Sequence, residues 1–237
     1  MGDIFRNRID AGRQLAAVLE PFAGRSDIVV LALPRGGVPV GYEVAEALRC
    51  PFDVLVVRKL GAPHNPELAI GAIATGDALY LNESVLRAVS VSEEQIMEAI
   101  ARERIELHRR ESAYRGAQPP AAVEGKTVIV VDDGMATGST MHAALNALRT
   151  RRPTRIVVAV PVCPAGAEAS FESVADDFIC VMQPDWFMGI GQFYIDFTQT
   201  TDEEVRACLA SAQAWQQKAS FGEDGGAHAA SPKGGTA

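Results

Sequence analysis

The sequence predicts a doubly wound α/β fold, in which helices cover both faces of a mainly parallel β-sheet. Its apolar, β-branched runs are nearly continuous, as expected of parallel strands that are buried on both faces. Helical patterns separate most of these runs, and such alternation indicates a parallel sheet. The strands are expected at 28–33, 53–57, 127–131, 155–160 and 178–182. The helices are expected at about 6–20, 38–49, 139–150 and 164–175.

The alternation breaks first at about residues 69–118, where we expect an insertion beside the sheet. Residues 69–84 contain two β-like runs around a turn, and Gly76 suits the first position of a type II′ turn, so this stretch predicts a hairpin. Ser92 then begins a Ser-Glu-Glu-Gln capping box, which predicts a charged helix over 92–114.

The second break is at about residues 184–200, which we expect to form a small hood. Its core, WFMGIGQFYIDF (186–197), holds five aromatic residues, and a helix is expected to follow over 202–218. The glycine-rich, polar stretch at 222–237 predicts a disordered tail. Residues 1–221 are therefore expected to form a single domain.

Composition disfavours several classes of function. The 237 residues are 48% hydrophobic, which is ample for a core, and the net charge of −8 disfavours nucleic acid as a partner. No apolar run reaches the length of about 18 residues that a membrane span needs, and the N-terminus lacks the apolar segment of a signal peptide. The cysteines are spread singly, which argues against a zinc site or disulfide framework and fits a cytoplasmic location. They are Cys50, Cys163, Cys180 and Cys208, each expected in the core.

The stretch DDGMATGST (132–140) places a glycine-containing turn between an expected strand and an expected helix. Such a turn binds anions, because backbone N–H groups and the helix dipole point at the ligand. Thr137, Ser139 and Thr140 add hydroxyl donors. The turn therefore suits a phosphate monoester.

The two acids before this turn need a different partner, because a phosphate would repel them. Asp132 and Asp133 could accept hydrogen bonds from ribose hydroxyls or hold a hydrated Mg²⁺. The alternative is a simple polar turn before a helix cap, but the hydroxyls and glycines that follow favour a ligand site. Together the acids and the turn suggest a phosphorylated sugar with a metal ion.

The first expected strand also ends in a glycine turn, LPRGG. Arg35 provides a planar cation for a second phosphate-like group, and Gly36 and Gly37 let the backbone approach it. Because ligands of open α/β sheets bind at the carboxyl ends of strands, we expect this turn and DDGMATGST to face one crevice.

Arg58 and Lys59 stand at the end of the next expected strand, before a loop rich in glycine and proline. Such a loop could close over a reacting centre and exclude water. His64 in this loop is either a general base or a solvated loop residue.

The stretch VIVVDDGMATGST resembles the 5-phosphoribosyl-1-pyrophosphate (PRPP) binding motif of type I phosphoribosyltransferases: four hydrophobic residues, two acids, a spacer and Thr-Gly-x-Thr. LPRGG is similar to that family's pyrophosphate-binding loop, and the Arg-Lys pair to the start of its mobile loop. The resemblance extends over about residues 25–185, although many members have a β-branched residue where this chain has Gly134. It implies an enzyme of nucleotide metabolism that transfers the phosphoribosyl group of PRPP to a nitrogenous acceptor, such as a nucleobase, and releases pyrophosphate.

The resemblance also implies a role for each matching residue. Asp132 and Asp133 would contact the ribose hydroxyls and, with Lys59, would be the catalytic residues. The cofactor Mg²⁺ would bind mainly through PRPP, with one of the two acids as a protein ligand. Pyrophosphate would bind to Arg35, Gly36 and Gly37, assisted by Lys59 or Arg58. The 5-phosphate would bind to Ala136, Thr137, Gly138, Ser139 and Thr140.

The acceptor in this family is commonly held by a small variable hood, for which the second break is our candidate. Four aromatic residues there could offer a flat apolar face to a ring, or could instead close the core beside the C-terminal helix. They are Trp186, Phe187, Phe193 and Tyr194.

Two other functions compete with the transferase. A PRPP-binding regulator on the same fold would use the site as a sensor, and a nucleic-acid-binding form of it would need a basic face that the acidic charge disfavours. A P-loop protein would need G-x-x-x-x-G-K-[ST], which is absent, and a receiver domain would carry its acidic pair near the first strand. The partners considered are PRPP, a small-molecule acceptor and a second copy of the chain in a homodimer.

Overall fold

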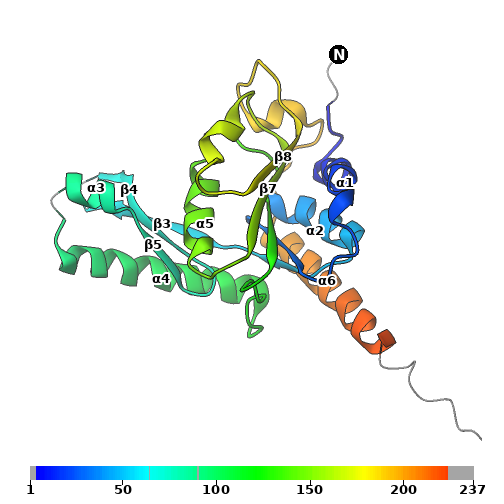
Figure 1. The fold of residues 1–237 in the computed structure, drawn as a ribbon, viewed down its shortest axis with the longest axis horizontal. Helices are drawn as coiled ribbons and strands as arrows, with labels where there is room; N and C mark the ends of the chain where they lie inside the picture. The colour runs from blue at the N-terminus through cyan, green and yellow to red at the C-terminus, as the bar shows by residue number, and fades with distance from the viewer. Residues whose placement is uncertain (1–3, 64, 90, 224–237) are drawn as a thin grey trace, which may run out of the picture.

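The computed structural model describes residues 4–63, 65–89 and 91–223. His64 and the predicted tail beyond Glu223 lie outside the described residues. Figure 1 shows a central sheet with helices on both faces, and a second, smaller sheet that extends away from it beside a long helix.

The central sheet confirms the predicted doubly wound fold. Its strands lie in the order β2-β1-β6-β7-β8, and every neighbouring pair is parallel. Ile28 pairs with Thr127, which pairs with Arg155, so the middle strands begin level and their carboxyl ends meet at one edge, where ligands of such sheets bind. The strands are β1 (Ile28–Ala32), β2 (Phe52–Val54), β6 (Thr127–Val131), β7 (Arg155–Val162) and β8 (Asp177–Met182).

Alternate residues of these strands face two separate layers of helices. On one face, side chains such as Val30 and Ile129 pack with residues of α1, α2 and α6. On the opposite face, neighbours such as Val29 and Val130 pack with α5. This alternation explains why the strand sequences are apolar throughout. The helices are α1 (Arg8–Val18), α2 (Gly37–Leu48), α5 (Ser139–Arg149) and α6 (Asp202–Glu223), the last of which continues past the predicted end at 218.

The second sheet has three antiparallel strands and contains the predicted hairpin. Two of its strands pair up to Ala74 opposite Ala78, within the stretch 69–84. The turn is not the expected type II′, because Gly76 and Asp77 both have positive φ, 76° and 55°, which is the pattern of a type I′ turn. The strands are β3 (Val57–Ala62), β4 (Asn65–Ala74) and β5 (Ala78–Leu81), in the order β3-β4-β5.

The single strand predicted at 53–57 is divided between the two sheets. The Leu55 N–H still donates to the Ala32 carbonyl in the central sheet, at 2.9 Å. The Val56 N–H instead donates to the Thr75 hydroxyl beside the hairpin turn, also at 2.9 Å. The chain thus changes sheets between two consecutive buried residues, which the apolar run does not reveal because both sheets bury it.

Two helices follow the hairpin. The capping box predicted for the longer one is present: the Ser92 hydroxyl accepts from the Gln95 N–H at 3.2 Å, and the Gln95 side chain accepts from the Ser92 N–H at 3.0 Å. The shorter helix was not predicted, and its cap is Asn82, which accepts from the Val85 N–H at 3.2 Å. They are α3 (Glu83–Ala88) and α4 (Glu93–Arg115), and α4 runs along the second sheet (Figure 1).

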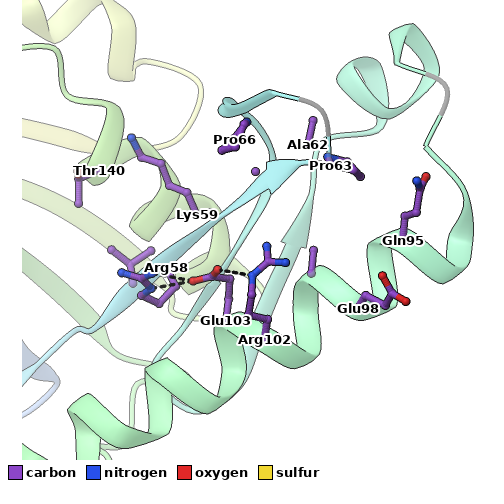
Figure 2. A pocket seen from close by; sticks show the side chains of 13 residues that line it. Arg58, Lys59, Ala62, Pro63, Pro66, Gln95, Glu98, Arg102, Glu103 and Thr140 are labelled. Atoms are coloured by element: carbon purple, nitrogen blue, oxygen red, sulfur yellow. Dashed lines mark hydrogen bonds and ion pairs between the residues drawn. The ribbon is translucent and has the colours of Figure 1, made fainter.

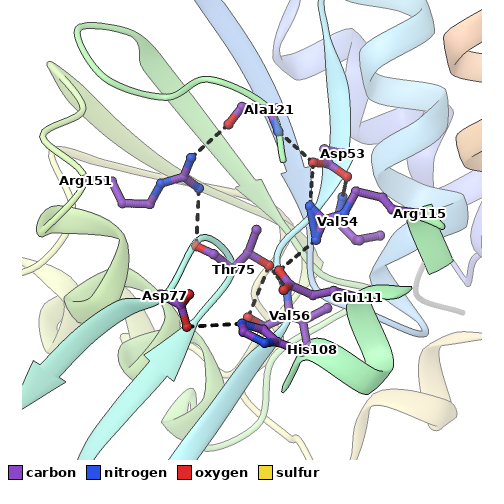
Figure 3. A network of polar contacts seen from close by, with 10 residues as sticks. All are labelled: Asp53, Val54, Val56, Thr75, Asp77, His108, Glu111, Arg115, Ala121 and Arg151. Carbon is purple, nitrogen blue, oxygen red and sulfur yellow. Dashed lines mark hydrogen bonds and ion pairs between the residues drawn. The ribbon is translucent and has the colours of Figure 1, made fainter. Parts of the chain in front are cut away.

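A polar network joins α4, the central sheet and the second sheet (Figure 3). Asp53 of β2 is buried and accepts hydrogen bonds from the Arg115 guanidinium at 3.2 Å and from the Ala121 N–H at 2.9 Å. Arg151 donates to the carbonyls of Thr75 and Ala121 at 3.4 and 3.0 Å. Because buried charges need partners, this network fixes the end of the second sheet that lies next to the core.

The segment between β7 and β8 is not the α-helix predicted over 164–175. It forms only a short 3-10 helix that begins at Ala167, because Gly166 adopts a left-handed conformation, with φ of 77°, that a right-handed helix cannot include. Phe171 nevertheless inserts into the core. The 3-10 helices are η1 (Glu20–Phe22), η2 (Ala167–Phe171) and η3 (Ile190–Phe193). Over the described ranges, the helices are too short or too polar to cross a lipid bilayer.

Candidate active site

The turns after β1 and β6 lie against each other at the carboxyl edge of the central sheet. The Leu33 N–H donates to the Val131 carbonyl at 2.8 Å, which brings the LPRGG turn beside the two acids. A Cβ atom on Gly36 would lie only 2.6 Å from Cγ of Asp133, and a Cβ atom on Gly37 would lie 2.8 Å from Cα of Asp132. Only glycine permits this approach, so the structure brings together the two turns that the sequence suggested would share a crevice.

The turn after the acids opens onto solvent at the start of α5. Gly138 precedes the helix with a φ of 68°, and a Cβ there would lie 2.7 Å from the Phe171 ring, so the position requires glycine. The Met135 N–H is held by the Val162 carbonyl at 2.9 Å. The remaining residues of the turn are exposed, namely Ala136, Thr137, Ser139 and Thr140. A helix N-terminus with exposed hydroxyls and N–H groups is suited to an anion.

The two acids carry perturbed pKa values. The pKa of Asp132 is raised well above its ordinary value, first because burial removes the carboxyl group from water and then because Asp133 is its neighbour. Burial also raises the pKa of Asp133, and the Arg8 guanidinium opposes this rise. The Asp133 N–H donates to the Asp132 carboxylate at 2.9 Å. Adjacent carboxylates whose environments differ in this way are typical of functional sites.

Arg8, the partner of Asp133, was not among the predicted site residues. Its Nε atom lies 2.8 Å from Asp133 Oδ2, and its Nη1 atom donates to the Thr198 carbonyl at 2.6 Å. The guanidinium also lies over the Phe197 ring, 4.1 Å from the ring centroid. A cation in the first turn of a helix opposes the helix dipole, and this unusual placement was the one local signal that Arg8 has a distant partner.

The predicted hood contacts the backbone of the acidic motif, at the Asp133 carbonyl and at Gly134. The Tyr194 hydroxyl donates to the Asp133 carbonyl at 2.6 Å, and its buried ring packs 5.3 Å from that of Phe5. A Cβ on Gly134 would lie 2.6 Å from the Ile190 side chain of η3, which explains why glycine follows the acids here. The Tyr194 ring therefore belongs to the interior of the hood and supports the acids.

The other hood aromatics lie nearer the surface. Trp186 is 76% exposed, whereas Phe187 and Phe193 are half-buried and stack with their centroids 5.4 Å apart. Trp186 and Phe193 line a cavity of about 560 Å³ that also reaches Gln14 of α1. Tyr194 is thus a core residue, although it packs with Phe5 and Val162 and not beside the C-terminal helix, whereas Trp186 is available to a ligand.

Arg58 and Lys59 point to opposite faces of β3, as neighbours on a strand do. The Lys59 ammonium donates to the Ser139 hydroxyl, so it reaches the turn after the acids. Arg58 instead donates to Glu103 of α4 at 2.7 and 2.9 Å (Figure 2). A cavity of about 710 Å³ between β3 and α4 extends from these side chains to Thr140. The structure therefore brings Lys59 to the site and commits Arg58 to an ion pair.

The Arg35 side chain lies against the helices rather than against the acids. It is 3.5 Å from Asp202 at the start of α6, and it lines a cavity of about 310 Å³ together with Arg109 and Arg110 of α4. The backbone of LPRGG thus faces the acids, while the Arg35 guanidinium faces the cavity that it lines with Arg109 and Arg110.

Comparison with known proteins agrees with this geometry. The family model for the phosphoribosyl transferase domain matches residues 3–198. Two strains of Mycobacterium tuberculosis have a "putative phosphoribosyl transferase" that is 45% identical over 210 residues, which cover 88% of this chain and 47% of that protein. The chain thus spans about half the length of the curated relatives that it matches.

Among solved structures, the crystal structure of TT1426 from Thermus thermophilus is similar over 88% of this chain and 98% of that one. The TM-score is 0.80 and the sequence identity is 42%. The motif, the fold and the domain match lead to one conclusion: the chain belongs to the type I phosphoribosyltransferase family.

Proposed function

We propose that the protein transfers the 5-phosphoribosyl group of PRPP to a nitrogenous acceptor and releases pyrophosphate. The observation that carries this proposal is the contact of the LPRGG turn with Asp133, next to the anion-binding turn that starts α5. The ribose would lie over Asp132 and Asp133, between a 5-phosphate at Thr137 and Ser139 and a pyrophosphate at Gly36.

The charges of the site suit the charges of this reaction. Departure of pyrophosphate leaves a sugar with oxocarbenium character, which the two carboxylates stabilise. Lys59 contacts Ser139, so in this proposal it binds the 5-phosphate of PRPP. Of the phosphate groups of PRPP, the resemblance had implied a role for Lys59 at the pyrophosphate only. The backbone of Gly36 and Gly37 would bind the pyrophosphate oxygens as negative charge develops on them.

Mg²⁺ fits this arrangement mainly as a ligand of PRPP. Within the described part of the chain, no three His, Cys, Asp or Glu side chains group closely enough to hold a metal ion, and Asp133 is paired with Arg8. Asp132 offers the carboxylate oxygens that suit Mg²⁺. The bound ion would neutralise charge on the leaving pyrophosphate.

The acceptor in this proposal binds beside the hood, and a nucleobase is the acceptor that we favour. Tyr194 and Ile190 place the hood against the acids, and therefore on the side of the ribose. Trp186 offers an exposed aromatic face, and Phe193, which stacks on Phe187, lines the same cavity. The protein would work in the cytoplasm, where free thiols persist, and the four cysteines have no disulfide in the described structure.

Thermal unfolding with PRPP and Mg²⁺, followed by an assay of pyrophosphate release with single nucleobases, tests the proposal. Wild-type protein is expected to melt at higher temperature with PRPP, because a ligand of the folded state stabilises it. Asp133→Asn is expected to abolish pyrophosphate release, whereas Asp27→Asn, directly before β1 at the opposite edge of the sheet, should retain it. Binding without release for any nucleobase would instead identify a PRPP-binding regulator. No thermal shift with PRPP would refute both functions.

A further inference from the structure

Two cysteines that the proposed reaction does not use lie in contact, one just after β7 and the other in β8. Cys163 directly follows β7, and Cys180 is in β8, the last strand of the central sheet (Figure 1). Their Sγ atoms are 3.2 Å apart, with the Cys163 thiol donating to the Cys180 sulfur. The Cys180 thiol lies 3.1 Å from the Met182 carbonyl. The two thiols therefore already face each other.

We propose that Cys163 and Cys180 are a dithiol that peroxide oxidises to an intrachain disulfide, and that this disulfide alters the anion-binding turn at the start of α5. Disulfide sulfurs lie about 2.05 Å apart, so the two Sγ atoms need to approach by roughly one ångström. Cys180 pairs with Val160 across the two strands, so Cys163 lies three positions farther along, and closing the bond requires the backbone after β7 to move.

The two thiols differ in exposure, and this difference determines which of them reacts with peroxide first. Cys180 is half-buried and Cys163 is buried, so peroxide reaches Cys180 first. The Cys180 thiolate attacks one peroxide oxygen, the O–O bond breaks, and the products are a sulfenic acid on Cys180 and, after protonation, one water. The Cys163 sulfur then attacks the sulfenic sulfur, the S–O bond breaks, and a second water leaves with the Cys163 proton. Two thiols and one peroxide thus give one disulfide and two waters.

The hydrogen bond between the thiols supports this order. Because Cys163 donates to it, the pKa of Cys180 is lowered from its ordinary value. The pKa of Cys163 is raised by the same interaction and by burial. Cys180 is therefore the thiol with more thiolate character, which is the reactive form.

The disulfide would close a loop that supports the anion-binding turn. The loop runs from 163 to 180 and includes Phe171, whose ring lies beneath Gly138 and stacks on His142 at 4.1 Å. At the start of the loop, the residue before Cys163 holds the Met135 N–H through its carbonyl. Movement of Cys163 toward Cys180 would therefore displace contacts on which the turn rests. This coupling depends on the proposed function, because it assumes that PRPP binds at this turn.

Peptide mapping by mass spectrometry before and after hydrogen peroxide tests the disulfide without reference to PRPP. The expected product is a crosslink between the peptides of Cys163 and Cys180, reversed by dithiothreitol. Cys208→Ser removes a thiol of similar exposure and should keep the crosslink. Cys163→Ser should lose it and leave a Cys180 sulfenic acid that a 1,3-diketone reagent labels. Absence of the 163–180 crosslink in wild-type protein, or labelling of other cysteines alone, overturns the proposal.

Calorimetric titration with PRPP and Mg²⁺ then compares the reduced and the oxidised protein. We expect the oxidised protein to bind PRPP at least several-fold more weakly, with full recovery after reduction, and Cys180→Ser to be insensitive to peroxide. Equal affinity of the two forms would refute the coupling. A crosslink in protein that does not bind PRPP even when reduced would refute the proposed function while leaving the dithiol established.

Discussion

The guanidinium of Arg8 donates to the carboxylate of Asp133 at 2.8 Å, across 125 positions of the chain. Both side chains are almost enclosed, with exposed fractions of 11% and 12%. The first helix thus compensates the charge of an acid that burial would otherwise drive toward its neutral form. Arg8, a residue outside the motif, therefore favours the ionised form of the Asp133 carboxyl group within it.

We expect Arg8→Ala to lower the free energy of unfolding by about 3 kcal/mol, because the Asp133 carboxylate would lose its partner in an enclosed place. Urea denaturation measures the change. Arg13→Ala on the same helix is the matched control: its partner Glu43 lies 2.9 Å away, but Arg13 is 65% exposed, so the loss should stay below about 1 kcal/mol. Equal losses in the two variants would contradict this assignment.

Gly36→Ala is expected to weaken PRPP binding roughly tenfold or more, which corresponds to about 1.4 kcal/mol. The added methyl group would overlap the Asp133 carboxylate and push it away from Arg8. Gly189→Ala is the control, because that glycine has extended backbone and open space around its Cβ position. Titration calorimetry with PRPP and Mg²⁺ distinguishes them, and unchanged affinity in Gly36→Ala would show that the acids do not meet the ligand there.

Lys59 and Arg58 are adjacent in sequence, yet their alanine variants should behave differently. Lys59→Ala is expected to weaken PRPP binding with little change in melting temperature, because its ammonium reaches the turn at Ser139. Arg58→Ala should lower the melting temperature and retain PRPP affinity, because it leaves Glu103 of α4 without its partner on β3. Calorimetry and thermal unfolding of both variants check this, and reversed behaviour would restore Arg58 to the site.

Substitutions should also distinguish the roles of the two hood aromatics Trp186 and Tyr194. Trp186→Ala is expected to raise the KM for the acceptor without affecting stability, because the side chain is 76% exposed. Tyr194→Phe should instead cost about 1 kcal/mol in the free energy of unfolding, since it removes the hydrogen bond to the Asp133 carbonyl. Steady-state kinetics and urea denaturation provide the two readouts. An acceptor KM that responds to neither variant would place the acceptor away from the hood.

Acid should remove one identifiable contribution to stability from α4. Hydrogen bonds from Arg109 and Arg110 lower the pKa of Glu106 from 4.5 to about 2. Because the folded-state pKa is the lower one, these ion pairs stabilise the fold fully above about pH 4.5, and the contribution is lost as the pH falls toward 2. The difference in melting temperature between wild type and Glu106→Gln should therefore be constant near neutral pH and shrink over that interval. A difference that persists at pH 2 would show another origin.

The central sheet and the acidic motif were predictable because their signals are local. Continuous apolar runs specify buried parallel strands, and the acids, glycine and hydroxyls of DDGMATGST are consecutive in the chain. The partition of the run at 53–57 between two sheets was not predictable, since it depends on hydrogen bonds that two neighbouring residues donate to Ala32 and Thr75. The 3-10 helix after β7 was missed because the periodicity of 164–175 is helical, while the left-handed Gly166 delays the start of the helix to Ala167.

The contacts that tune the site were missed for a related reason. Arg8 and Tyr194 reach Asp133 from opposite ends of the chain. The place of Arg8 in the first turn of a helix indicates a partner, but nothing local to either residue identifies that partner as Asp133. The side chain of Arg58 has the same chemistry as a pyrophosphate ligand, and only the position of Glu103 shows that it is committed elsewhere. The sequence shows which chemical groups are available for a site. Which partner each group contacts becomes known only from the three-dimensional structure.

The change of sheets at Leu55 and Val56 gives the second sheet the mechanics of a cantilever. Its root is clamped to the core by the hydrogen bond from Leu55 to Ala32, the Val56–Thr75 bond ties that root to the hairpin turn, and farther along the sheet is flanked by α4 and α5. A deflection of such a beam is smallest near the root and grows with distance from it. Lys59 stands three residues after Val56 at this root, so a deflection of the far end of the sheet would displace its ammonium, over the turn, by only a small part of that movement.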